Sequence, residues 1–416
     1  MNVKKLMAAG VLLLVAAALP GAGFAQTHGG RVIDALNRKP IANAMVTMDD
    51  TVVRTRNDGT FQITAPGDTL AVRAYGHKRL QIPVRALAED PDVPLKPVTP
   101  KALYLSFYGI GSKTLRESAL NLIDHTELNA MVIDVKGDRG MVAFKVPIPL
   151  ASQVGAQNLF TIRDAKAMLQ ALRLRDVYTI ARIVVFKDNP LASARPDLAV
   201  RRGGAVWHDR EHLAWVDPFK SEAWDYNIAI AVEAAKAGFD EIQFDYARFP
   251  DSPGLTFSRP PTLKNRIGAI NGFLAAARKA LMPYNVFLAA DIFGYVMWNE
   301  DDTHIGQQLE DLPGIVDYIC PMLYPSGYQF GIPGYRNPVQ HPHEIVQLSL
   351  EKGLRRTRVE AIRFRPWLQA FRDYAFGAGQ FGGPRIRTQI DAAEEVGSDG
   401  WMLWNPSNKY TADGLK

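Results

Sequence analysis

Residues 238–250 read Gly-Phe-Asp-Glu-Ile-Gln-Phe-Asp-Tyr-Ala-Arg-Phe-Pro, and this stretch decides the fold. Its centre, Glu241–Asp245, is a short and largely apolar run that ends in a carboxylate. The preceding residues, Ser221–Ala237, are rich in Ala, Val and Ile and predict an amphipathic helix. A helix followed at once by a short strand is typical of proteins that alternate helices and strands around a parallel sheet.

The same alternation extends outward in both directions, from Lys101 to the end of the chain. Eight strands in about 315 residues predict a (β/α)8 TIM barrel over 101–416. An open, doubly wound sheet is the alternative, but Gly109-Ile-Gly111 lacks the third glycine of a dinucleotide-binding turn. The eight predicted strands are Ala102–Tyr108, Ala130–Val135, Val177–Val185, Glu241–Asp245, Val286–Asp291, Val316–Met322, Pro366–Ala370 and Gly400–Trp404.

The composition limits the class of protein. The chain has 416 residues, 47% of them hydrophobic and 22% charged, and its formal net charge is +5. These values are those of a globular protein and exclude a disordered chain. The basic residues are mixed with acidic ones, so we expect no nucleic-acid partner. The single cysteine, Cys320, excludes an intramolecular disulfide, and its apolar neighbours predict a buried thiol.

The first 25 residues have the pattern of a secretory signal peptide. Lys4 and Lys5 precede an apolar run, Leu6–Leu19, and small residues lead to a cleavage point after Ala25. The apolar run is shorter than the ~20 residues that cross a bilayer. We therefore expect a periplasmic or secreted protein with no membrane span after cleavage.

Residues 29–98 predict a small β-sandwich. Short apolar runs such as Ala44–Met48 and Thr60–Ile63 alternate with turn signals such as Asn57-Asp58-Gly59. The pattern resembles the carboxypeptidase regulatory-like domain, which implies a non-catalytic accessory. The proline-rich piece Pro91–Pro100 is interpreted as the linker to the barrel.

Polar and aromatic residues follow the predicted barrel strands at their carboxyl ends, where barrel enzymes place their active sites. Asp245 and Asp291 end the fourth and fifth strands and are the candidate catalytic residues. Each could instead pair with a nearby cation or cap the next helix. The candidate substrate-binding residues are Asp134, Arg182, Gln243, Tyr246, Arg248, Tyr324, Trp367, Gln369, Trp404 and Asn405.

Two carboxyl groups on neighbouring strands suit the cleavage of a glycosidic bond. One protonates the leaving oxygen, and the other attacks the sugar or activates water. The aromatic residues Tyr246, Tyr324, Trp367 and Trp404 could stack on sugar faces, or they could be core and rim packing. The sequence thus favours a hydrolase acting on a polysaccharide or oligosaccharide, with a glycan-binding barrel that does not cleave as the alternative.

These motifs resemble a bacterial family of glycoside-hydrolase-like domains known as domain of unknown function 4015. The resemblance rests on Leu128–Lys136, Trp215–Pro218, Gly238–Pro250, Asp317–Pro325, Arg365–Gln369 and Gly400–Asn405. It implies a TIM barrel distantly related to α-amylase-like and α-galactosidase-like enzymes. The acid that ends strand four is the nucleophile in those enzymes, which corresponds here to Asp245. α-Amylase-like barrels take the proton donor from strand five, where this chain has Asp291 instead of their Glu.

Metal-dependent hydrolysis is a further alternative. His208-Asp-Arg-Glu-His212 matches a zinc-protease pattern, but that pattern requires a helix, and the flanking glycines predict a loop. Asp134, Asp138 and Asp188 could hold Ca²⁺ or Mg²⁺, although their spacing matches no known loop. We therefore expect no metal and no cofactor.

Overall fold

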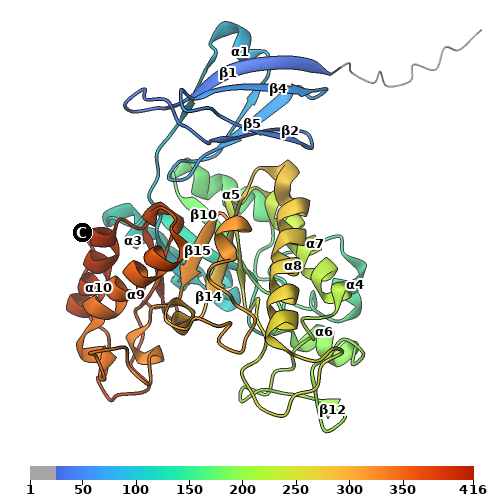
Figure 1. The fold of residues 1–416 in the computed structure, drawn as a ribbon, viewed down its shortest axis with the longest axis vertical. Coiled ribbons are helices and arrows are strands. Elements are labelled where there is room, and N and C mark those ends of the chain that lie inside the picture. The colour runs from blue at the N-terminus through green and yellow to red at the C-terminus, as the bar shows by residue number, and fades with distance from the viewer. Residues whose placement is uncertain (1–24) are drawn as a thin grey trace, which may run out of the picture.

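The computed structural model describes residues 25–416, which form a small N-terminal part and a larger C-terminal part (Figure 1). The predicted signal peptide lies outside the described residues except for Ala25. None of the helices in residues 25–416 is long and apolar enough to cross a membrane.

The N-terminal part is a β-sandwich, as predicted. One sheet has the strand order β4-β1-β7 and the other has the order β3-β2-β5-β6. Alternate side chains, such as Phe61 and Ile63, are buried between the sheets. The elements are β1 (Gln26–Asp34), β2 (Met45–Met48), β3 (Thr51–Arg54), β4 (Thr60–Ala65), β5 (Thr69–Arg73), β6 (Leu80–Pro83), α1 (Ala86–Glu89) and β7 (Asp92–Leu95).

The predicted linker is wrong over its first half. Asp92–Leu95 forms β7, which pairs in parallel with the end of β1. Pro94 is tolerated there because β7 is an edge strand and needs ladder hydrogen bonds on one side only. The connection to the barrel is therefore limited to residues 96–100.

The C-terminal part is a barrel of eight parallel strands, which confirms the predicted fold. The order around the ring is β15-β14-β13-β10-β9-β8-β17-β16. Bridges from Ile319 to Phe364 and from Met322 to Trp367 join β15 to β16 and close the ring. The strands are β8 (Lys101–Leu105), β9 (Ala130–Lys136), β10 (Tyr178–Val184), β13 (Glu241–Asp245), β14 (Phe287–Ile292), β15 (Tyr318–Pro321), β16 (Trp367–Gln369) and β17 (Trp401–Trp404).

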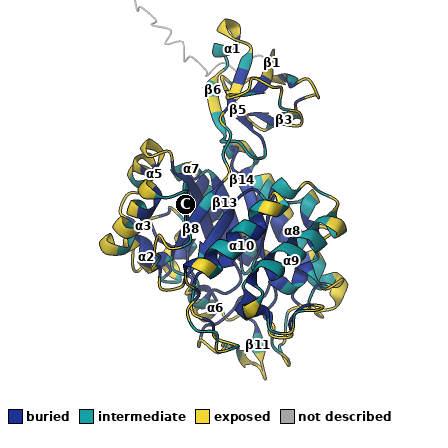
Figure 2. Ribbon diagram, turned by 90° about the vertical axis from the view of Figure 1, so that its left-hand side faces the viewer, coloured by how far each residue is buried: buried dark blue, intermediate teal, exposed yellow. Residues whose placement is uncertain are grey.

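Helices surround this ring and bury its outer face, while their own outer faces remain partly exposed (Figure 2). A short hairpin, β11 (Arg201–Arg202) and β12 (Ala205–Val206), extends from the loop after β10. The α-helices are α2 (Phe107–Gly111), α3 (Lys113–His125), α4 (Pro149–Gln153), α5 (Ala165–Leu174), α6 (Asn189–Ala194), α7 (Ser221–Ala237), α8 (Leu263–Leu281), α9 (Pro342–Thr357) and α10 (Gly383–Val396). The 3₁₀ turns are η1 (Met282–Tyr284), η2 (Gly294–Met297), η3 (Leu312–Gly314), η4 (Pro325–Gly327), η5 (Pro338–Gln340) and η6 (Ala361–Arg363).

The two-residue period of the strands divides their side chains between two cores. Ile242 and Phe244 of β13 pack outward against the helices. Apolar side chains of the other strands, such as Val132, Ile180 and Ala289, fill the interior of the barrel. Along β13 the remaining positions, Glu241, Gln243 and Asp245, are buried polar residues, so this strand carries polar groups through the whole depth of the interior.

A buried ion-pair network closes the interior of the barrel at the amino-terminal ends of its strands. The Arg365 guanidinium donates to both carboxylate oxygens of Glu241, at 2.9 and 2.7 Å, and to a carboxylate oxygen of Asp399, at 2.9 Å. Tyr178 Oη donates to Glu241 at 3.0 Å. Each acid has a hydrogen-bonded partner, although burial still raises the pKa of both Glu241 and Asp399.

The sandwich contacts the amino-terminal ends of the barrel strands. Arg73 of β5 donates to Asp317, just before β15, at 2.6 Å, and both side chains are buried. Arg79 donates to the main-chain oxygens of Gly238 and Phe239, just before β13. Figure 1 shows α6 and β12, which follow a strand, at the opposite end of the barrel. The carboxyl ends of the strands are thus free of the sandwich.

The Arg73–Asp317 pair gives a test of this contact. We expect Arg73→Met to lower the free energy of unfolding by about 3 kcal/mol, because it leaves a buried carboxylate without its closest cation. The matched control is Arg31→Met, which removes a half-exposed arginine from its pair with Asp92 and should cost much less. Urea unfolding measures both. Equal losses in the two variants would contradict the buried contact.

Candidate active site

Asp245 ends β13 and is fixed from two sides. Its Oδ2 accepts hydrogen bonds from Arg182 Nε at 2.9 Å and from Arg182 Nη2 at 2.6 Å. Its Oδ1 accepts one from the backbone N–H of Tyr246 at 2.6 Å. Tyr246 has a φ of 51°, a left-handed conformation that few residues other than glycine adopt. The bend of the chain directly after β13 therefore aims a backbone donor at Asp245.

Arg182, from the neighbouring strand β10, also holds two further carboxylates. Nη1 donates to Asp134 at 2.7 Å and Nη2 donates to Asp138 at 2.9 Å. Burial disfavours the guanidinium charge, but the three carboxylates outweigh it and raise the pKa of Arg182 well above its usual value. One cation faces three acids, so the site has an excess of negative charge.

Asp134 of β9, like Asp245, accepts three hydrogen bonds. It accepts from Tyr104 Oη at 2.7 Å, from the backbone N–H of Phe107 at 3.1 Å and from Arg182. Burial, only partly opposed by the charge of Arg182, raises its pKa to about 6. Asp134 therefore changes its protonation near neutral pH.

Asp291 of β14 lies beside Asp245 but has a different environment. The register pairs Gln243 with Ala289 and Phe244 with Ala290, so Asp245 and Asp291 occupy the next position on the two strands. Trp367 Nε1 donates to Asp291 Oδ1 at 2.7 Å, whereas Asp291 Oδ2 is buried with no hydrogen-bond partner. Burial and the negative charge of Asp245 raise the pKa of Asp291 well above its usual value. Asp291 therefore tends to keep its proton.

The structure brings four of the predicted binding residues to these two acids. Asp134 and Arg182 complete the ion-pair cluster. Trp404 lies with its ring 4.9 Å from the Arg182 guanidinium. Trp367 contacts Asp291 directly, but it is only 1% exposed. Its side chain thus serves as a hydrogen-bond donor to an acid, and its ring is not open to a sugar.

Two other predicted aromatic or basic residues lie at the edge of this cluster. Tyr324 is half-buried, and burial, together with the charges of Asp291 and Asp245, raises its pKa. Arg248 lies over the rings of Tyr246 and Trp215, at 4.9 and 5.2 Å. Tyr246, Tyr324 and Arg248 are all partly exposed and can contact a ligand.

Three predicted amide residues are buried, and two of them have their hydrogen bonds satisfied by the protein. Gln369 bonds both the backbone N–H and the hydroxyl of Ser326. Asn405 donates to the main-chain oxygens of Ala370 and Lys409. Gln243 lies deeper in the barrel, beside Met402 Sδ, and its Oε1 has no partner. Gln369 and Asn405 position loops.

A hollow of about 200 Å³ opens beside the cluster at the carboxyl end of the barrel. Its lining includes two acids and four aromatic residues, namely Asp134, Asp138, Tyr104, Phe107, Tyr108 and Trp404. Tyr104 and Trp404 stack with their ring centroids 4.1 Å apart. The hollow therefore combines aromatic surface with two carboxylates of the Arg182 cluster.

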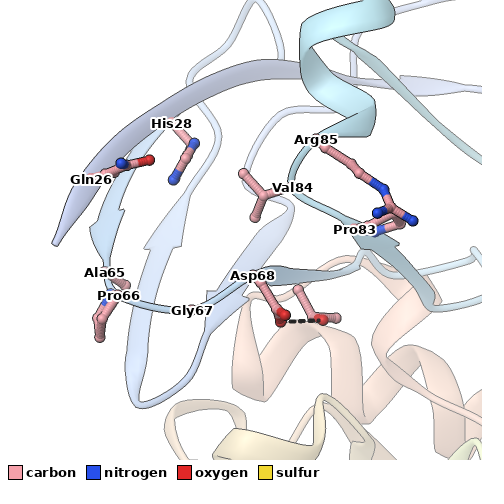
Figure 3. A pocket seen from close by; sticks show the side chains of 10 residues that line it. Gln26, His28, Ala65, Pro66, Gly67, Asp68, Pro83, Val84 and Arg85 are labelled. Atoms are coloured by element: carbon pink, nitrogen blue, oxygen red, sulfur yellow. Dashed lines mark hydrogen bonds between the residues drawn. The ribbon is translucent and has the colours of Figure 1, made fainter. Parts of the chain in front are cut away.

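A second hollow, of about 460 Å³, lies in the sandwich between the start of β1 and the loop before α1 (Figure 3). His28, Asp68 and Arg85 are among its lining residues, and Asp68 accepts a hydrogen bond from Thr69 at 3.0 Å. It carries one carboxylate and no pair of acids, so it does not match the predicted chemistry.

The metal alternatives receive no support from residues 25–416, where no group of three His, Cys, Asp or Glu side chains could hold an ion. His208 and His212 lie in a loop, and His212 has a positive φ. Asp188 turns away from Asp134 and Asp138, because it caps α6 and pairs with Lys136 at 2.7 Å. Cys320 is buried, as predicted.

The sequence analysis missed Tyr104, whose hydroxyl fixes Asp134. The signal was present, because Tyr104 is two residues from Ala102 and therefore shares its inward face of β8. It also missed the direct contact between Trp367 and Asp291, which joins two strands that are not neighbours in the ring and has no local signature.

A parallel eight-stranded barrel with acidic and aromatic residues at the carboxyl end of its strands is typical of glycoside hydrolases. The chain belongs to the family DUF4015, described as "Putative glycosyl hydrolase domain", which matches residues 102–410. A comparison with curated proteins finds no significant match.

The chain is also similar to solved structures. A hypothetical protein from Ruminiclostridium thermocellum is 38% identical, with 45% of this chain and 96% of that chain covered and a TM-score of 0.41. The PgaB (BpsB) glycoside hydrolase domain from Bordetella bronchiseptica is 18% identical, with 75% and 95% covered and a TM-score of 0.53. At 18% identity, the similarity to the Bordetella domain shows a shared fold alone.

The raised pKa of Asp134 predicts a measurable pH dependence. The folded protein binds more protons than the unfolded chain between about pH 4 and pH 6, so this residue lowers stability as the pH rises through that window. We expect Asp134→Asn to remove up to about 3 kcal/mol of this dependence. The stability of the variant relative to the parent should therefore increase from pH 4 to pH 7.

Urea unfolding across this pH range measures the effect, with Asp251→Asn as the control at an exposed carboxylate. A constant difference between Asp134→Asn and the parent at every pH would contradict the raised pKa.

Proposed function

We propose that this protein is an exported glycoside hydrolase that cleaves a glycosidic bond in a polysaccharide or envelope glycan. The observation that carries the proposal is a pair of adjacent acids in opposite surroundings. Arg182 donates two hydrogen bonds to Asp245, whereas burial and the charge of Asp245 raise the pKa of Asp291 well above its usual value. Glycosidic cleavage needs one acid of each kind.

Asp245 is the nucleophile in this proposal. A carboxylate oxygen of Asp245 forms a bond to the anomeric carbon while the bond from that carbon to the leaving oxygen breaks. Asp291 donates its proton to the leaving oxygen. In the second step water attacks the anomeric carbon, Asp291 accepts a proton from that water, and Asp245 is released as a carboxylate.

The strand register supports retention of configuration. Asp245 and Asp291 occupy the same level on adjacent strands, and adjacent strands lie about 4.8 Å apart. Retaining enzymes place their two carboxyl groups about 5–5.5 Å apart, whereas inverting enzymes need about 6.5–9.5 Å to admit a water molecule. The arrangement therefore favours a covalent glycosyl intermediate on Asp245.

Export is part of the proposal and rests on the amino-terminal sequence. Lys4 and Lys5, the apolar run Leu6–Leu19 and the small residues before Ala25 support a signal peptide. A periplasmic or extracellular location agrees with a glycan substrate.

The strong burial of the two acids favours one other reading. Asp245 is 3% exposed and Asp291 is 1% exposed, which also suits a barrel that binds a glycan and does not cleave it. The two functions differ in whether new reducing ends appear.

We expect Asp245→Asn to lower kcat by about 10⁴-fold or more on a glycan that the parent cleaves, because the variant has no nucleophile. Asp291→Asn should lower kcat by about 10²–10⁴-fold, as expected for a general acid. The activity of Asp291→Asn should recover on an aryl glycoside with a dinitrophenyl leaving group, since that group departs without a proton.

The assay is release of reducing ends from bacterial exopolysaccharides and peptidoglycan, with mass spectrometry of the products. Asp251→Asn, at an exposed position, is the matched control. The assignment fails if both active-site variants release reducing ends as fast as the parent. Binding of glycans by the parent without any cleavage would establish the non-catalytic reading instead.

Trp367 gives an independent test of Asp291 as the acid. Its indole N–H stabilises the Asp291 carboxylate, so Trp367→Phe should raise the pKa of Asp291 further. Activity requires the protonated acid, and we therefore expect the basic limb of the kcat/KM profile to move up by about one pH unit. Trp298→Phe is the control, because it removes an indole hydrogen bond to Ser349 on α9. An unshifted limb in Trp367→Phe would assign that limb to another group.

A further inference from the structure

The exposed aromatic side chains of the described residues are all at one end of the barrel. They are Tyr108, Phe160, Phe293, Phe330 and Tyr374. Each lies on a segment that follows a barrel strand, at the carboxyl end where the candidate active site is. The sandwich and the amino-terminal end of the barrel carry exposed leucines, such as Leu36 and Leu174, but no exposed aromatic ring.

Four of these rings, which we call the rim aromatics, lie along one half of the barrel mouth: Tyr108, Phe293, Phe330 and Tyr374. They follow β8, β14, β15 and β16. In the ring of eight strands β14 and β8 are four positions apart, that is, on opposite sides. A ligand that contacts both Phe293 and Tyr108 must therefore cross the mouth of the barrel.

The Tyr374 ring is held in place by a buried carboxylate. Asp373 accepts hydrogen bonds from Ser326 Oγ at 2.7 Å and from the backbone N–H groups of Ala375, Phe376 and Ala378. Gln369 fixes Ser326 in turn. The loop that presents Tyr374 is thus ordered before any ligand binds, which lowers the entropic cost of binding.

The Phe330 ring is 90% exposed, yet its backbone is also fixed. Tyr295 Oη accepts a hydrogen bond from the Phe330 N–H at 2.9 Å and donates to the Gly331 carbonyl at 3.2 Å. The Tyr295 ring also contacts Phe293, with the centroids 6.0 Å apart. Tyr295 therefore both contacts the Phe293 ring and fixes the backbone of Phe330.

These rings are continuous with the candidate catalytic acids. Tyr374 stacks on Phe371, with centroids 6.1 Å apart and the planes at 6°, and Phe371 packs edge-on against Tyr324. Tyr324 is close enough to Asp291 and Asp245 for their charges to act on it. On the other side, Tyr108 lines the hollow that contains Asp134 and Trp404.

We propose that the rim aromatics bind a polysaccharide chain across the mouth of the barrel, so that the chain is cut at internal bonds. The inference rests on the proposed function and specifies its substrate as a polymer. Exposed rings that are carried by fixed loops after four different strands suit the flat C–H faces of successive pyranose units, whereas a protein partner would require one contiguous apolar patch. Rings on both sides of the acids imply sugar units on both sides of the cleaved bond.

The test is binding to polymers and to short sugars in the Asp245→Asn background, where cleavage does not interfere. The probes are dextran, galactomannan, glycol chitosan and alginate, each as a polymer and as its trisaccharide, measured by affinity electrophoresis and calorimetry. We expect at least one polymer to bind. Combined replacement of Tyr108, Phe330 and Tyr374 by Ala should weaken its Kd at least about tenfold and change trisaccharide binding less than about twofold.

Leu174→Ala is the matched control, because Leu174 is 84% exposed at the end of α5. An unchanged polymer Kd in the triple variant overturns the inference, as does the absence of binding to every polymer. Loss of self-association on size-exclusion chromatography, without any loss of glycan binding, would assign the rings to a second copy of the chain.

The two proposals can fail separately. Polymer binding that depends on the rings, without cleavage by the parent, supports this surface and rejects the hydrolase. Cleavage by the parent that yields only terminal sugars, equally fast in the triple variant, supports the hydrolase and rejects this surface.

Discussion

The candidate site depends on one buried cation. Arg182 forms hydrogen bonds with Asp134, Asp138 and Asp245, and it lies against the rings of Tyr104 and Trp404. Without the guanidinium, three neighbouring carboxylates would repel one another in a medium that screens charge poorly. The cation therefore holds the Asp245 carboxyl group in place beside a second strongly buried acid, Asp291. The pKa of Asp291 depends on the same group of charges, because the negative charge of Asp245 adds to burial in raising it.

The fold could be predicted from the sequence to a large extent, because the spacing of apolar residues along the chain distinguishes strands from helices. Apolar runs of five to nine residues alternate with helical stretches, and each of the eight predicted runs overlaps a barrel strand. The error at Asp92–Leu95 arose because a proline suggested a linker, whereas an edge strand accepts one. The strands β6 and β7 alternate, but each has only four residues and ends at or contains a proline, so the sequence pattern alone does not identify them.

The candidate site could be predicted only in part. The carboxyl ends of the strands placed Asp134, Arg182, Asp245 and Asp291 in one region, and the structure brings these four together. The sequence could not assign partners, since contacts such as that from Trp367 to Asp291 span 76 residues. It also could not distinguish an amide that contacts a ligand from one that supports a loop, as Gln369 does. Such distinctions depend on which loop packs above the residue.

The charged residues at the two ends of β13 also affect the register in which this strand pairs with its neighbours. Glu241 pairs with Arg365 at one end of this strand, and Asp245 pairs with Arg182 at the other. A slip of one residue would turn the apolar side chains of the strand inward and expel its acids from the interior. A slip of two residues would preserve the apolar pattern. It would, however, place the Gln243 amide opposite one of the two arginines and leave the other arginine without its carboxylate partner. The burial of apolar side chains does not exclude this slip of two residues, whereas the two ion pairs do. Charge therefore determines the final register of β13.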